Sequence, residues 1–215
     1  MIRMDYEIIF VHIPKTAGNS ISDAIRSFPI KKRSVIDRAV ARIRPQKIIQ
    51  LAKHAKASEI KEIVGNVVWY KFFSFCVVRN PWDTMVSSYF WWLEKSQKWE
   101  PFYKARKEIE RMEGFESFLM SKYGQDKINQ ITTDMWDYIT DEKGKVIVDC
   151  IVRFENIQDG WKVICSRVGV HGYDLKMLNC SQRREKGYRK YYTEEMRDTI
   201  EHRFTKIIDR FGYKF

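Results

Sequence analysis

Short apolar runs dominate the pattern of this chain, each followed by a polar loop and then by apolar residues at helical spacing. The first run, residues 6–13, is rich in β-branched and aromatic side chains and ends at Pro14, which predicts a buried strand. Apolar residues at helical spacing over 21–28 predict a helix after it. The order strand, tight loop, helix is typical of nucleotide-binding α/β folds.

The same order recurs further along the chain. Residues 72–78 form a second buried run that breaks at Arg79-Asn80-Pro81, and Pro81 suits the first position of a helix. Further strands are predicted over 47–51 and 145–154, after a turn at 141–144 in the second case. Helices are predicted over the segments 58–64, 81–93, 101–130, 155–168 and 193–211. The pattern predicts an α/β fold.

The composition favours one ordinary globular domain. The chain has 215 residues, of which 44% are hydrophobic and 14% aromatic, so a packed core is attainable and disorder, collagen-like repetition and a small disulfide scaffold are excluded. We find no internal repeat and no linker. Residues 1–215 are therefore predicted to form a single domain.

The chain is strongly basic, and its charge is unevenly placed. Lysine and arginine number 39 against 28 acidic residues, a net charge of +11. Residues 31–61 hold ten of the basic residues against Asp37 and Glu59, which gives 10 − 2 = +8 of that total. This stretch is either a solvated surface or a basic wall beside an anion site, and the sequence leaves both interpretations open.

Cysteine usage and the N-terminus indicate the compartment. The four cysteines form no CxxC pair and have no nearby histidine, so buried free thiols in a reducing compartment are expected. The N-terminus has no signal-peptide layout, and no apolar stretch approaches the roughly 18 residues of a membrane span. We expect a cytoplasmic protein without a membrane span.

The loop between the first strand and helix is the first candidate site. A phosphate fits there because first-turn N–H groups point outward, the helix dipole favours an anion, and a lysine adds positive charge. The Walker pattern GxxxxGK[ST] is absent, which disfavours ordinary kinase or ATPase chemistry. The alternative is a helix start with a conventional N-cap. The candidate residues are Lys15, Thr16, Ala17, Gly18, Asn19 and Ser20.

Arg79 and Ser87 form the second candidate site. Arg79 follows a predicted strand, at the sheet edge where open α/β folds bind ligands, and Ser87 lies one turn beyond Asp83 on the next helix. Arginine offers a fork that matches phosphate oxygens, and serine adds a neutral donor. The alternative is a structural pair between Arg79 and Asp83 at the helix start.

These motifs together resemble a known family. Residues 12–18 (HIPKTAG), followed some sixty residues later by 78–83 (VRNPWD) and Ser87, are similar to the carbohydrate sulfotransferases that use 3'-phosphoadenosine 5'-phosphosulfate (PAPS), the Golgi-type and bacterial sulfotransferase family 2. The match continues almost to the end of the chain and is weakest over 95–140. Its further segments are 53–55 (KHA), 153–156 (RFEN), 178–181 (LNCS), 188–192 (YRKYY) and 211–215 (FGYKF).

The resemblance implies a P-loop-like three-layer sandwich with a central, mainly parallel sheet flanked by helices. In this family the loop at 15–20 would hold the 5'-phosphosulfate, while Arg79 and Ser87 would hold the 3'-phosphate. Lys15 would also touch the oxygen that bridges phosphate and sulfate, where a cation stabilises developing charge. The usual family residue at position 19 is Thr or Ser, so Asn19 is a departure.

A sulfuryl acceptor must lose a proton as it attacks, and histidine is suited to accept it. The family's proposed base matches His54, whereas His12, beside the loop, is expected to form supporting hydrogen bonds. Related enzymes also place a basic loop over the 3'-phosphate, although a plain solvated loop is the equal alternative. The candidates for that loop are Arg183, Arg184 and Lys186.

The sequence thus predicts a PAPS-dependent sulfotransferase that acts on a hydroxyl of a carbohydrate or glycoconjugate. We expect no metal, because the donor's charge can be met by Lys15, Arg79 and backbone amides. The basic stretch 31–61 suggests an anionic acceptor, and attraction of the donor explains it equally well. Two alternatives are a P-loop nucleotide kinase or NTPase that binds magnesium through Thr16, and a module that binds nucleic acid or another polyanion.

Overall fold

The computed structural model describes residues 1–31, 51–95, 100–125, 132–176 and 187–215. The chain divides into two compact units, which are described separately below. The first unit contains residues Met1–Val78 and Met135–Leu178, and the second contains Arg79–Asp134 and Asn179–Phe215.

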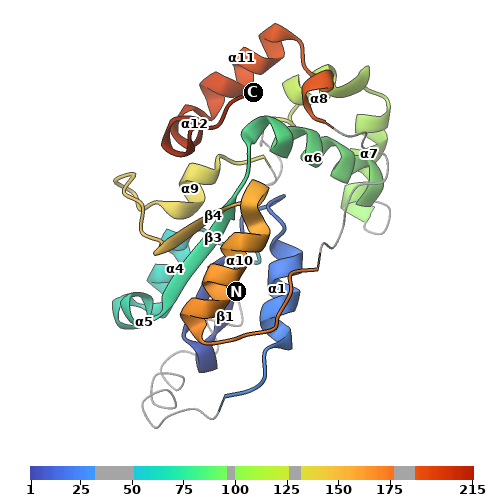
Figure 1. Ribbon diagram of the computed structural model, residues 1–215. Helices are drawn as coiled ribbons and strands as arrows, with labels where there is room; N and C mark the ends of the chain where they lie inside the picture. The colour runs from blue at the N-terminus through green and yellow to red at the C-terminus, as the bar shows by residue number, and fades with distance from the viewer. Residues whose placement is uncertain (32–50, 96–99, 126–131, 177–186) are drawn as a thin grey trace. The chain divides into compact units, whose positions relative to one another are not determined.

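A four-stranded sheet forms the centre of the first unit (Figure 1). Strands β2, β3 and β4 run parallel, and the short β1 pairs antiparallel with β2 at one edge. Because the three long strands are parallel, their carboxyl ends meet at one edge of the sheet, where open α/β folds bind ligands. In sheet order the strands are β1 (Ile2–Arg3), β2 (Ile8–Val11), β3 (Phe73–Val78) and β4 (Cys150–Arg153).

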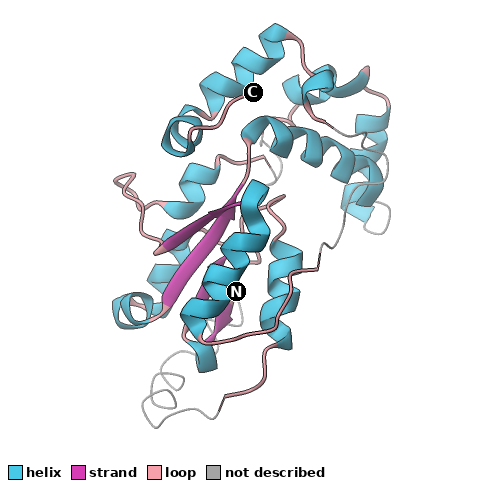
Figure 2. Ribbon diagram, in the orientation of Figure 1, coloured by secondary structure: helices cyan, strands magenta, loops and turns pink. Residues whose placement is uncertain are grey.

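Helices cover both faces of this sheet, as the cyan and magenta ribbons of Figure 2 show. Phe10, Phe75 and Val152 pack with the helices α1 and α10 in one apolar core. The alternate strand residues Val11 and Cys76 are also fully buried, as expected for strands covered on both faces. The helices of this unit are α1 (Gly18–Ser27), α4 (Ala57–Val64), α5 (Asn66–Lys71), α9 (Met135–Ile139) and α10 (Ile157–Val168).

The described part of the second unit contains helices and no strand, and aromatic residues link its segments. The Trp82 indole donates a 3.0 Å hydrogen bond to the Arg197 carbonyl, and the Tyr192 hydroxyl donates one of 2.9 Å to the Trp82 carbonyl. These bonds join the start of α6 to the C-terminal segment. The helices are α6 (Pro81–Lys95), α7 (Glu100–Glu110), α8 (Gly114–Met120), α11 (Glu194–Arg203) and α12 (Thr205–Phe211).

The predicted α/β class and the mainly parallel sheet are confirmed, with four differences in element bounds. The helix predicted over 101–130 is two helices, α7 and α8, which are separated by a turn at 111–113. The first strand begins at Ile8 because the segment Met4–Tyr6 forms a 3-10 turn. The strand predicted over 145–154 covers only Cys150–Arg153. The long C-terminal helix is two helices that break at Phe204. The strand predicted at 47–51 lies almost wholly outside the described residues, and the single-domain prediction stays a prediction.

Two further observations concern membrane spans and cysteines in the described residues. Within the described ranges no helix is long and apolar enough to span a bilayer. Cys76, Cys150 and Cys165 carry free thiols, and burial raises the pKa of each. Cys180 lies outside the described residues.

Candidate active site

The loop between β2 and α1 has a strained backbone. Lys15 and Ala17 adopt left-handed conformations, with φ of 65° and 64°, which cost about 1 kcal/mol or more each for residues with a side chain. The buried Thr16 hydroxyl donates a 2.9 Å hydrogen bond to the Ile13 carbonyl and closes the loop. Strained residues of this kind concentrate at ligand-binding sites, so the backbone indicates a binding loop.

Helix α1 begins without a side-chain cap. Its N-cap residue is Ala17, and no side chain at that position accepts from the first turn, so the alternative of a conventional N-cap is wrong. An α-helix leaves its first N–H groups without partners inside the helix, at the positive end of the helix dipole. Those groups here belong to the turn 18–20. The helix start therefore suits an anion.

Gly18 is required by close packing against His12. A Cβ atom at Gly18 would lie 1.9 Å from both Cδ2 and Nε2 of the His12 imidazole, far inside van der Waals contact. The glycine therefore lets the first turn of α1 lie directly against the side chain that follows β2. The ring of His12 is buried among Gly18, Phe10 and His54.

His54 is held beside this loop by a backbone group. Its Nδ1 lies 2.9 Å from the carbonyl oxygen of His12, and the two imidazole rings meet edge to face, with centroids 4.5 Å apart. A carbonyl only accepts hydrogen bonds, so Nδ1 carries the proton and Nε2 keeps the lone pair. The geometry thus presents Nε2 as the basic atom of His54.

Burial keeps both histidines neutral near pH 7. Burial, aided by repulsion from the neighbouring side chains of His54 and Lys53 when these are protonated, lowers the pKa of His12 to about 2. Burial also lowers the pKa of His54, although its hydrogen bond to the His12 carbonyl acts in the opposite direction. A neutral histidine can accept a proton, so the electrostatics of the site suit His54 for general base catalysis.

Lys53 reaches the start of α1 from the same segment as His54. Its Nζ donates a 2.9 Å hydrogen bond to Oδ1 of Asn19, the second residue of the helix. Burial, followed by the charge of Arg26, lowers the pKa of Lys53. The sequence identified Asn19 as a residue of the loop and Lys53 only as part of the segment 53–55, so this contact is new.

Arg79, Asp83 and Ser87 form one cluster in the second unit. Arg79 is buried, and its Nε and Nη2 both lie 2.6 Å from Oδ2 of Asp83, while its Nη1 donates a 3.3 Å hydrogen bond to Oγ of Ser87. The Asn80 side chain accepts from the Asp83 N–H at 3.3 Å and caps α6, which begins at Pro81 as predicted. Arg79 therefore forms both the structural pair with Asp83 and the predicted contact with Ser87.

Several predicted residues lie outside the described residues. These are Arg183, Arg184 and Lys186, together with most of the basic stretch 31–61. Their roles stay predictions.

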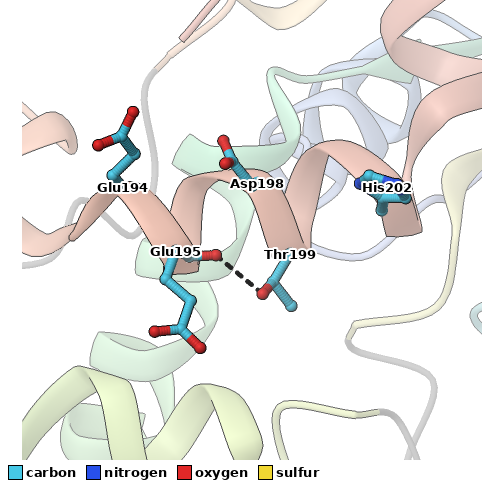
Figure 3. Close-up of a pocket in the computed structure, with 5 residues that line it drawn as sticks. All are labelled: Glu194, Glu195, Asp198, Thr199 and His202. Carbon is cyan, nitrogen blue, oxygen red and sulfur yellow. Dashed lines mark hydrogen bonds between the residues drawn. The ribbon is translucent and has the colours of Figure 1, made fainter.

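The pocket drawn in Figure 3 shares no lining residue with the loop at 15–20 or with the Arg79 cluster. It lies along one face of α11, where the Thr199 hydroxyl donates a 2.9 Å hydrogen bond to the Glu195 carbonyl. Three of its five lining residues are acidic, so it repels an anionic ligand. The pocket is lined by Glu194, Glu195, Asp198, Thr199 and His202.

Comparison with known proteins adds one finding. The model of a family described as the sulfotransferase family matches residues 1–214, almost the whole chain. A search of curated proteins returned no match.

Proposed function

Because the chain belongs to the sulfotransferase family and is a transferase, we propose a specific reaction for it. It moves a sulfuryl group from PAPS to a hydroxyl of a carbohydrate or glycoconjugate by in-line displacement. The observation that carries the proposal is the pairing of His54 with the loop at 15–20. A neutral base, oriented through the His12 carbonyl, belongs to the same compact unit as an uncapped helix start that suits an anion.

The groups of the loop fit the charged end of PAPS. The uncapped first turn of α1 offers N–H donors to phosphate oxygens, and Lys15 adds positive charge. The Thr16 hydroxyl already bonds the Ile13 carbonyl, so Thr16 contributes through its backbone. We assign the 5'-phosphosulfate to this loop, in agreement with the family resemblance.

The Arg79 cluster fits the 3'-phosphate. Asp83 fixes two nitrogens of the Arg79 guanidinium, and the third points to the Ser87 hydroxyl. A phosphate oxygen can be shared by Nη1 and that hydroxyl, since both can donate to it. We therefore assign Arg79 and Ser87 to the 3'-phosphate.

Each step of the chemistry has a residue in this chain. When bound, PAPS supplies an activated sulfuryl group and leaves as 3',5'-ADP. His54 Nε2 accepts the proton that the acceptor hydroxyl loses as its oxygen bonds to sulfur. Lys15 and the loop N–H groups stabilise the negative charge that builds on the departing phosphate oxygen as its bond to sulfur breaks.

The kinase alternative loses support at Thr16. That alternative needs a hydroxyl after the P-loop lysine to bind magnesium. The Thr16 hydroxyl is buried and donates to the Ile13 carbonyl, so it is engaged in the loop itself.

Transfer of labelled sulfur tests the proposal. PAPS labelled with sulfur-35 is incubated with the protein and a panel of neutral and acidic saccharides, with His54→Asn as the test variant and His171→Asn, an exposed histidine of the same unit, as the control. We expect label in at least one saccharide with wild type and His171→Asn only. Binding of PAPS without transfer to any saccharide would overturn the carbohydrate acceptor, and phosphorylation from ATP–Mg would overturn the donor.

A further inference from the structure

The bond between Lys53 and Asn19 joins two residues that lie 34 positions apart in the sequence, at the first turn of α1. Lys53 directly precedes His54, the proposed base, and Asn19 is the second residue of α1. The ammonium group donates at 2.9 Å, and because it can only donate, its partner on Asn19 must be the amide oxygen.

This bond positions Lys53 without neutralising it. Among the described residues no carboxylate forms an ion pair with Lys53, and the partner that it does have, the Asn19 amide, carries no charge. Arg26 adds a further positive charge nearby, which lowers the pKa of Lys53. Partial burial and the nearby positive charge of Arg26 both disfavour the charged form of Lys53. A bound anion would offset both effects.

The Lys53 ammonium keeps donors for a ligand. It has three N–H groups, of which one bonds to Asn19. Asparagine at position 19 reaches Lys53 better than the usual family residue would, since its amide oxygen extends further from the backbone than a threonine or serine hydroxyl. The bond to Lys53 therefore gives a structural reason for asparagine at this position.

We propose that Lys53, held by Asn19, is a second binding cation for the phosphosulfate end of the donor, in addition to Lys15. This inference rests on the proposed function and adds a residue pair to it. A charged hydrogen bond to the 5'-phosphate strengthens binding of any nucleotide that carries this phosphate, and Asn19 acts only through Lys53.

Calorimetric binding of two nucleotides tests the pair. 3',5'-ADP carries the 5'-phosphate, and adenosine 3'-monophosphate lacks it. The variants are Lys53→Gln, Asn19→Ala and their combination. The control is Lys56→Gln, which removes an equal charge from the same segment, where Lys56 pairs with Asp137 at 3.6 Å.

We expect Lys53→Gln to weaken binding of 3',5'-ADP about tenfold, the size of one charged hydrogen bond, and to leave adenosine 3'-monophosphate unaffected. Asn19→Ala should weaken it less, and the double variant should equal Lys53→Gln alone, because the two residues act as one unit. Lys56→Gln should bind both nucleotides as wild type does.

Other outcomes overturn the inference in distinguishable ways. Wild-type affinity of Lys53→Gln for 3',5'-ADP, together with a lowered melting temperature, would make the pair purely structural. If Lys53→Gln lost the same affinity for both nucleotides, Lys53 would act through long-range attraction and not through a contact with the 5'-phosphate. If wild type bound neither nucleotide, the proposed function itself would fail, and this inference with it.

Discussion

The Nδ1 atom of His54 lies 2.9 Å from the carbonyl oxygen of His12. This contact joins the segment 53–55 to the end of β2, the first of the parallel strands. It fixes both the ring orientation and the tautomer of His54. Because the partner is a backbone group, no substitution at position 12 removes it directly. The proposed base is thus oriented by the fold itself.

His54→Asn separates the orienting atom from the basic atom. The asparagine amide can still donate to the His12 carbonyl, but it has no counterpart of Nε2. We expect turnover to fall by about a hundredfold or more, the usual contribution of a general base, while affinity for 3',5'-ADP is retained. Steady-state rates and nucleotide binding measured on one preparation check this. Turnover within about threefold of wild type would mean that another group takes the proton.

The buried imidazole of His12 predicts acid sensitivity of the fold. Its pKa falls from about 6.5 in the unfolded chain to about 2 in the folded protein. Below pH 6.5 the unfolded state therefore binds a proton that the folded state does not, so stability is complete above that pH and decreases below it. The slope from this one group is about 1.4 kcal/mol per pH unit.

Chemical denaturation of His12→Phe and wild type at pH 7 and pH 5 checks this prediction. Phenylalanine keeps a planar ring against Phe10 but cannot titrate. The variant should lose less stability than wild type between the two pH values, and His171→Gln, at an exposed position, serves as the control. Equal losses in His12→Phe and wild type would contradict the prediction.

Gly18→Ala tests the close packing at the start of α1. The new methyl group would meet the His12 ring at 1.9 Å, so the ring or the helix must move, at a cost of about 1–3 kcal/mol for an overpacked site. The same substitution should cost less in a His12→Ala background, since the space is then free. Unfolding free energies of the four proteins give the coupling directly, and a cost independent of residue 12 would exclude the clash as its cause.

Ser87→Ala tests the 3'-phosphate assignment. Loss of one donor should weaken binding of 3',5'-ADP about fivefold to tenfold, with no change for 5'-AMP, which lacks the 3'-phosphate. Ser88→Ala is the matched control, because Ser88 is buried on the same helix and donates to the Thr84 carbonyl at 2.9 Å. That variant should lower stability and leave affinity alone. Equal effects on both nucleotides would refute the assignment of Ser87.

The sequence predicted the framework of the first unit well, because its signals are local. Apolar runs of β-branched and aromatic residues identified β2 and β3, and Pro81 marked the start of α6. The strand at Cys150–Arg153 was predicted too long because residues before it pair with another segment: Val146 forms an antiparallel bridge with Thr140. The apolar pattern does not reveal which segment a residue pairs with.

The contacts of the candidate site were less predictable. Motifs identified Gly18, Arg79 and His54, but not the distances among neighbours. The bond from Lys53 to Asn19 spans 34 residues of chain, and hydrophobic periodicity carries no information at that separation. The break between α11 and α12 at Phe204 also escaped prediction, since the apolar pattern continues through it.

The central claim is that this chain binds PAPS, and thermal stability with nucleotides tests it most directly. Wild type and Arg79→Lys, which keeps a charge beside Asp83 but lacks the guanidinium fork, are melted with 3',5'-ADP, ATP–Mg or 5'-AMP. A ligand at about 100 times its dissociation constant adds roughly 2.7 kcal/mol. We predict such stabilisation of wild type by 3',5'-ADP alone and a smaller shift in Arg79→Lys. Stabilisation by ATP–Mg alone, or by no nucleotide, would contradict the account.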